Sequence, residues 1–190
     1  MKSSKKEKVF RLLSPEEYIR TKSRSLPLYQ CFVNSSWEDS HLANIMVARR
    51  HPNGNITTCI YLVDLFCQGV KDTAWFFNKP LSEYEKTIQE MRVQLELEQV
   101  NYTIIHNIIF AALEFAEEYD FHPHKDFTSV SRFMLEEDTD QIELLDIECG
   151  MNGKPAYMRT PGHSKNETQR IISKLERNPG PGNYYFFDQV

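Results

Sequence analysis

The feature that most constrains the fold is a hairpin signal in the first half of the chain. Two segments rich in β-branched and apolar residues, 42–50 and 56–65, flank Asn53-Gly54, a pair that is typical of a tight β-turn. If these are the two turn residues, Val47 lies opposite Ile60. Both faces of the predicted hairpin are apolar, so we expect it in the interior of a sheet, with a neighbour on each side.

The rest of the chain shows helix and strand signals in a mixed order. Serine followed three residues later by glutamate marks helix starts, and apolar residues recur at helical spacing over 102–119. A second hairpin is expected to turn at Asn152-Gly153. We expect helices at 15–22, 82–98, 102–119 and 165–177, and strands at 28–34, 142–150, 155–159 and 184–190.

This order predicts an α+β fold with one domain. An antiparallel sheet of five to six strands is expected to pack against three to four helices that cover one of its faces. A chain of 190 residues is long enough for one sizeable core and too short for two ordinary domains. We expect residues 1–8 to be a disordered basic tail and residues 9–190 to form the domain.

Composition narrows the cellular context. No apolar run approaches the roughly 20 residues that a membrane helix needs, and the basic N-terminus lacks the apolar stretch of a secretory signal. The four cysteines lie at least eight residues apart, so the chain has no CxxC metal or redox pair. We therefore expect buried thiols and a cytoplasmic protein with no membrane contact.

Charge is distributed unevenly along the chain. The formal net charge is −5, yet residues 1–24 hold eight Lys or Arg against three Glu, which leaves −10 for the remainder. The segment 136–148 contains seven acids and no base. A basic arm on an acidic body is suited to bind a polyanion, to dock on an acidic partner, or to fold back on its own acidic segment.

The leading functional hypothesis is therefore an accessory protein that binds nucleic acid or another polyanion through the basic arm. A second hypothesis is a protein–protein adaptor whose acidic 136–148 segment meets a basic partner. The candidate polyanion-binding residues are Lys5, Lys6, Lys8, Arg11, Arg49, Arg50, Arg159 and Lys165.

A third hypothesis rests on His122-Pro123-His124-Lys125-Asp126. Pro123 favours an extended backbone at His122, and in an extended run His122, His124 and Asp126 project to one face. Two imidazoles and a carboxylate are suitable ligands for a transition metal, as in a metal-dependent hydrolase. The alternative is that these histidines only follow a helix C-terminus, where positive charge is favourable.

A second cluster, Asp64, Cys67, Lys71 and Asp72, supplies candidate catalytic residues. Asp64 and Asp72 could contribute to a nuclease that holds a divalent cation between carboxylates. Cys67 could act as a nucleophile if the fold brought a histidine to it. The alternative is that Asp64, at the end of an apolar strand, caps the following loop.

Three stretches carry a resemblance to a known family. Residues 14–22, Leu26-Pro27 and residues 61–72 resemble a family of bacterial proteins of uncharacterised activity. The resemblance implies a bacterial origin, and it implies no activity or cofactor.

Overall fold

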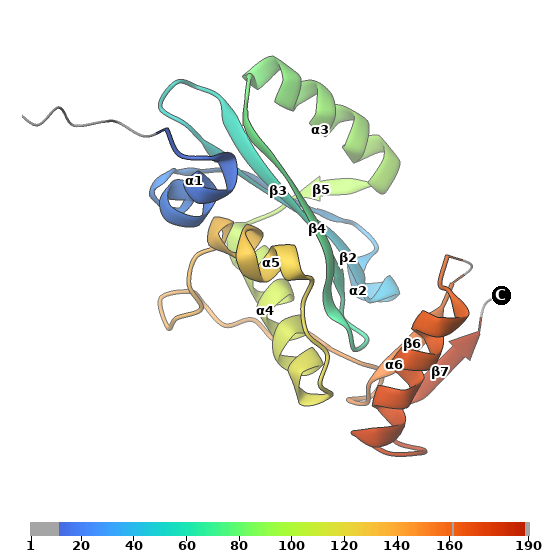
Figure 1. Cartoon of the computed structure of the whole chain (residues 1–190). Coiled ribbons are helices and arrows are strands. Elements are labelled where there is room, and N and C mark those ends of the chain that lie inside the picture. The colour runs from blue at the N-terminus through green and yellow to red at the C-terminus, as the bar shows by residue number, and fades with distance from the viewer. Residues whose placement is uncertain (1–11, 161, 189–190) are drawn as a thin grey trace, which may run out of the picture.

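The computed structural model describes residues 12–160 and 162–188, and a five-stranded antiparallel sheet forms its centre (Figure 1). The strands are β1 (Leu28–Asn34), β2 (Leu42–Arg50), β3 (Ile56–Asp64), β4 (Gly69–Lys79) and β5 (Leu97–Gln99). They lie in the order β4-β3-β2-β1-β5. The β2–β3 hairpin therefore has a neighbour on each side, which confirms its predicted interior position.

The register of this hairpin differs by one residue from the prediction. Val47 pairs with Cys59, because the connection is a five-residue loop over 51–55 and not a two-residue turn. His51 N–H donates to Asn55 O at 2.8 Å and closes the loop. Gly54 has a φ of +86°, as a turn glycine requires.

Helices cover both faces of the sheet, whereas the sequence predicted helices on one face. The face with Val47 and Tyr61 packs mainly against α4 through residues such as Ile108. The opposite face, with Met46, packs against Ile88 of the helix that precedes β5. The second helix layer follows from the apolar character of both faces of β2, since each needs cover from water.

The helices divide between the two faces as Figure 1 shows. On the α4 face lie α1 (Pro15–Lys22), α4 (Tyr102–Glu118), α5 (Lys125–Ser129) and the 3-10 turns η1 (Ser23–Ser25) and η2 (Ser131–Met134). The other face carries α3 (Leu81–Leu95). The short helix α2 (Trp37–Ser40) connects β1 to β2.

A smaller unit at one end of the sheet contains β6 (Ala156–Arg159), α6 (Lys165–Arg177) and β7 (Tyr185–Asp188). Strands β6 and β7 pair directly and in parallel, and α6 connects them in the chain. The predicted turn at Asn152-Gly153 is present, since Met151 and Lys154 form an antiparallel bridge around it, and the predicted strand 155–159 corresponds to β6. The predicted strand 142–150 is wrong: residues 142–149 form no strand, so the two segments do not pair as a hairpin. The side chain of Asn107 instead binds the backbone of Glu143 and Leu145, each at 2.9 Å.

The capping signals locate most helix starts. Ser14 and Ser164 each accept a hydrogen bond from the first turn of the helix that follows, as predicted, and Asn101 does the same for α4. The helix predicted at 82–98 is shorter, because Glu96 adopts a left-handed backbone and the chain then forms β5. The predicted tail, residues 1–8, lies outside the described residues.

Candidate functional site

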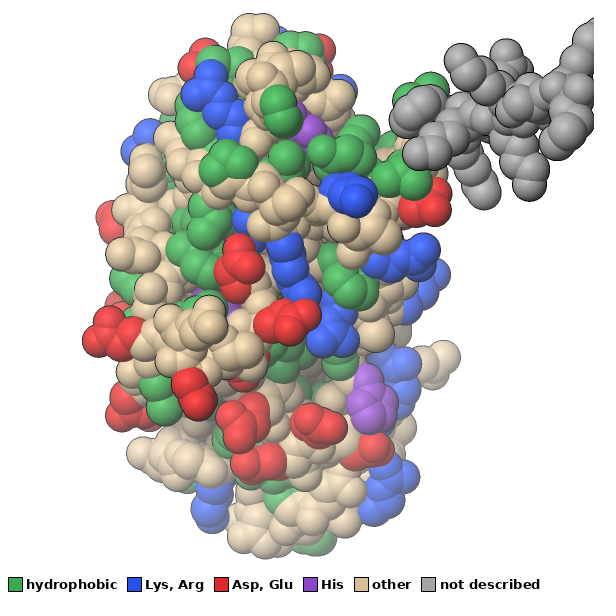
Figure 2. Space-filling model, turned by 90° about the vertical axis from the view of Figure 1, so that its left-hand side faces the viewer, with side chains coloured by type: hydrophobic (Ala, Val, Ile, Leu, Met, Phe, Trp, Pro, Cys, Tyr) green, Lys and Arg blue, Asp and Glu red, His purple; other side chains and the backbone are tan. Residues whose placement is uncertain are grey.

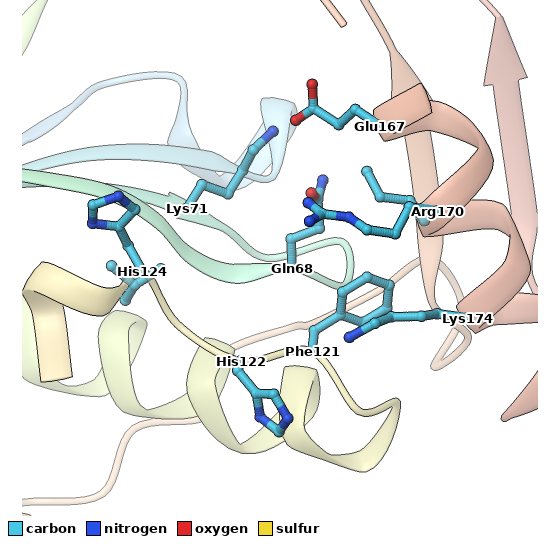
Figure 3. Close-up of a pocket in the computed structure, with 10 residues that line it drawn as sticks. Gln68, Lys71, Phe121, His122, His124, Glu167, Arg170 and Lys174 are labelled. Carbon is cyan, nitrogen blue, oxygen red and sulfur yellow. The ribbon is translucent and has the colours of Figure 1, made fainter. Parts of the chain in front are cut away.

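A cleft with a cavity of about 360 Å³ lies where three distant parts of the chain meet (Figure 3). Its walls come from the β3–β4 turn with the start of β4, from the loop between α4 and α5, and from α6. The residues that line it are Gln68, Val70, Lys71, Phe121, His122, His124, Glu167, Arg170, Ile171 and Lys174.

The turn between β3 and β4 is closed by the carboxylate of Asp64. Its Oδ1 accepts from the backbone N–H of Cys67 at 3.0 Å and of Gln68 at 3.3 Å. Its Oδ2 accepts from the Gln68 side-chain amide at 3.1 Å. Asp64 therefore holds the turn and fixes the Gln68 side chain at the wall of the cleft.

A bulge at the start of β4 positions Lys71. The register shifts between Leu62 and Val63 of β3, so Lys71 has no paired residue opposite it. Bulges redirect the side chain of the extra residue, and Lys71 extends into the cleft (Figure 3). Its Nζ lies 3.8 Å from Asp64 Oδ2, a distance longer than that of a strong charge-assisted hydrogen bond.

The loop after α4 is attached to β4. His124 N–H donates to Val70 O at 2.8 Å, and the His124 Nδ1 accepts from Asp126 N–H at 3.3 Å at the start of α5. His122 Nε2 lies 3.5 Å from Asp120 Oδ1. In Figure 3 the two imidazoles point away from each other, although both line the cavity.

Helix α6 closes the cleft with its polar side. Ser164 caps the helix, and Ile171 and Leu175 are buried against the rest of the fold. Residues three and four apart share one side of a helix. That spacing brings three charged side chains to the cleft: Glu167, Arg170 and Lys174.

Ionic contacts attach α6 to the end of α4. Lys174 Nζ donates to Asp120 O at 2.5 Å and lies 5.1 Å from the centre of the Phe121 ring. Arg177 forms an ion pair of 2.8 Å with the Asp120 carboxylate. Asn178 adds a 2.7 Å hydrogen bond to Tyr119 O. These contacts fix the cationic end of Lys174 beside the apolar floor of the cleft.

The residues that line the cleft carry a positive balance. They include three cations, Lys71, Arg170 and Lys174, and one carboxylate, that of Glu167. Within the part of the chain that the structure describes, neither Arg170 nor Glu167 forms an ion pair. An uncommitted guanidinium next to two further cations is suited to bind an anionic group.

The predicted catalytic cluster does not form one reactive centre. Lys71 lines the cleft, but Asp64 holds the turn through three hydrogen bonds. Cys67 is buried in an apolar cluster, and burial followed by the nearby Asp64 charge raises its thiol pKa well above the usual value. Asp72 is exposed, and its Oδ1 accepts from Thr73 N–H at 2.8 Å. Of these four residues, Lys71 is the one that lines this cleft.

The predicted metal ligands are not brought together. Within residues 12–160 and 162–188, no group of three or more His, Cys, Asp or Glu is arranged to hold a metal ion. The extended run expected through Asp126 ends at His124, because α5 begins at Lys125. His122 and His124 instead line the cleft from a loop.

The candidate polyanion-binding residues have different environments. Arg49 was predicted to bind a polyanion, but its side chain is 1% exposed and pairs with Glu136 at 2.6 Å. Arg159 pairs with Asp188 at 3.1 Å. Arg50 and Lys165 are exposed. Four others lie outside the described residues: Lys5, Lys6, Lys8 and Arg11.

The acidic segment 136–148 is partly used within the fold. Glu136 pairs with Arg49, and Glu137 pairs at 2.5 Å with Arg24 from the basic N-terminal part of the chain. The remaining acids of the segment are exposed. Figure 2 shows acidic and basic side chains intermixed on the side that carries α1, and no continuous basic face appears there.

Sequence reasoning missed most residues of the cleft. Gln68, Phe121, Glu167, Arg170 and Lys174 were not selected, although the helix at 165–177 was predicted. The helical spacing of the charged residues on α6 was visible in the sequence. The sequence did not show which part of the chain this side of α6 would face, because that depends on the tertiary fold.

Comparisons with known proteins give no further assignment, since no family model, curated protein or solved structure matches this chain. The resemblance to a bacterial family therefore stays a prediction. Among the helices of the described residues, none has the length and apolar character needed to cross a membrane.

Proposed function

We propose that this protein binds a small anionic ligand that carries a phosphate group, and that the cleft between β4 and α6 is the site. The observation that carries the proposal is the convergence of Lys71, Arg170 and Lys174 on one cavity. Arg170 has no carboxylate partner among the described residues. A guanidinium and two ammonium groups suit the several acceptor oxygens of a phosphate.

A small ligand fits this site better than a nucleic acid. The cavity of about 360 Å³ is at the lower end of the range for small-molecule sites. The chain as a whole has a net charge of −5, which opposes coating by a long polyanion. The predicted nucleic-acid contacts Arg49 and Arg159 are already paired with carboxylates.

The location proposed for this binding protein is the cytoplasm. All four cysteines are free thiols, three of them buried and Cys149 partly buried. Unpaired thiols in a fold of this size are typical of a reducing compartment.

Calorimetric titration of the full chain with inorganic pyrophosphate tests the proposal. We expect saturable binding of one pyrophosphate per chain. Arg170→Ala should weaken binding about tenfold or more, since a hydrogen bond to a charged group contributes roughly 1.5–3 kcal/mol. The matched controls are Lys165→Ala, an exposed cation at the start of α6, and Arg50→Ala on β2, and both should bind as the wild type does.

Two results would contradict the proposal. One is the absence of pyrophosphate binding at low salt. The other is binding that Arg170→Ala leaves unchanged while deletion of residues 1–11 abolishes it. That second result would favour the polyanion hypothesis built on Lys5, Lys6, Lys8 and Arg11.

A further inference from the structure

Glu167 is the sole acid among the residues that line the cleft. Its backbone N–H donates to the Ser164 cap at 3.2 Å, but its carboxylate forms no ion pair with any described residue. In Figure 3 this carboxylate points from α6 towards the space beside Lys71. The dipole at the N-terminus of α6 favours an acid at this position. That effect does not explain why the Glu167 carboxylate points into a cleft lined by cations.

A carboxylate here has a predictable effect on binding. It repels a bare anion, and it accepts hydrogen bonds but donates none. Inorganic phosphate near neutral pH can donate a P–OH hydrogen bond to Glu167, but the repulsion between the two negative charges opposes that bond. A ligand with hydroxyl groups would gain a charge-assisted hydrogen bond at the same carboxylate.

Gln68 provides a second acceptor on the facing wall. Its Nε2 donates to Asp64 Oδ2 at 3.1 Å, which fixes the amide and leaves its Oε1 without a partner among the described residues. Glu167 and Gln68 thus present acceptor atoms from α6 and from the β3–β4 turn. The cleft combines cations for an anionic group with acceptors for neutral donors.

The Phe121 ring at the floor of the cleft is a poor stacking surface for a nucleobase. Phe121 is the phenyl ring of the cleft, and it is 7% exposed. Lys174 Nζ lies 5.1 Å from its ring centre. A base that stacked on this ring would have to displace the ammonium from it.

Building on the proposed anion site, we propose that its ligand is a phosphorylated sugar or polyol. The phosphate contacts Lys71, Arg170 and Lys174, and the hydroxyl groups donate to Glu167 and Gln68. Glu167 is in this arrangement the specificity-determining residue, because it favours a hydroxylated phosphate ester over free phosphate.

Calorimetry with inorganic phosphate, glucose 6-phosphate and adenosine monophosphate tests this assignment on the full chain. We expect the sugar phosphate to bind at least tenfold more tightly than free phosphate, and more tightly than the nucleotide. Glu167→Gln removes the charge and keeps an acceptor, so free phosphate should bind more tightly and the preference should fall at least threefold. Glu176→Gln, an exposed acid on α6 outside the cleft lining, is the matched control and should change neither value.

The outcomes separate this inference from the function on which it rests. Equal affinity for free phosphate and the sugar phosphate would overturn the inference and leave the anion site intact. A preference unchanged in Glu167→Gln, or tighter binding of the nucleotide, would also overturn it. If none of the three compounds binds while pyrophosphate does, the inference alone is wrong. If pyrophosphate does not bind either, the proposed function is wrong as well. A melting temperature equal to that of the wild type establishes that each variant folds.

Discussion

Arg49 combines a full charge with nearly complete burial. Its guanidinium donates to Met134 O at 2.9 Å and to Leu26 O at 2.6 Å, and it pairs with Glu136 at 2.6 Å. A buried charge is tolerated only when it is paired and its donors are satisfied. Arg49 therefore fastens the start of the acidic segment and the chain before β1 to the centre of the sheet.

Removal of the Glu136 carboxylate should destabilise the protein more than removal of the Glu137 carboxylate. We expect Glu136→Ala to lower the free energy of unfolding by about 2 kcal/mol, since it leaves Arg49 without its counter-charge. Glu137→Ala should change it by less than about 0.5 kcal/mol, because Glu137 is 73% exposed and its pair with Arg24 is screened by water. Urea denaturation measures both, and equal losses would contradict this account of Arg49.

Two glycines with positive φ should respond differently to substitution. At Gly54 an added Cβ would meet no atom within 4 Å, so Gly54→Ala should cost about 1 kcal/mol of backbone strain. At Gly150 the Cβ would lie 2.7 Å from the Phe115 ring and would also press on the backbone carbonyl of Lys154. Gly150→Ala should therefore cost about 3 kcal/mol or more. Similar denaturation midpoints for the two variants would contradict this placement of Gly150.

At the scale of elements, the β3–β4 turn shows how a polar residue that looks catalytic can have a structural role. The Asp64 carboxylate accepts two backbone N–H groups, which is the behaviour of a cap. Asp64→Asn keeps an oxygen for those bonds and should cost less than about 1 kcal/mol. Asp64→Ala should cost about 2 kcal/mol.

Thermal or urea unfolding of the two Asp64 variants distinguishes the roles. A purely metal-binding or catalytic role of Asp64 would leave the stability of both variants close to that of the wild type. A smaller stability loss for Asp64→Asn than for Asp64→Ala supports the cap. Equal stability of both variants to the wild type would contradict it.

Elements with strong local signals were predictable. The strands 28–34 and 42–50 were located to the residue, and so was the helix 165–177, because hydrophobic patterning and caps act within each segment. Strand β4 was not predicted, although exposed and less exposed residues alternate from Asp72 to Phe77, and neither was β5, which is only three residues long. The strand predicted at 142–150 did not form, and there Asn107, more than thirty residues away, binds the backbone of Glu143 and Leu145.

At the scale of the whole molecule, the cleft could not be predicted from local patterns. Its cations come from β4 and α6, about a hundred residues apart, and α6 is oriented by the contacts of Asp120 with Lys174 and Arg177. The sequence did point to Lys71 and to the His122–His124 run. Lys71 was assigned to a catalytic cluster and the two histidines to a metal site, while the fold brings all three residues to one cavity.

The central claim is that this cavity binds an anionic ligand, and nuclear magnetic resonance measures it most directly. Titration of the ¹⁵N-labelled full chain with pyrophosphate should produce saturable shifts of backbone amides in three segments: 68–71, 121–124 and 167–174. The same titration of Arg170→Ala should require at least tenfold more pyrophosphate. Saturable shifts confined to other parts of the chain, such as the surroundings of Arg50, or no saturable shift at all, would contradict the claim.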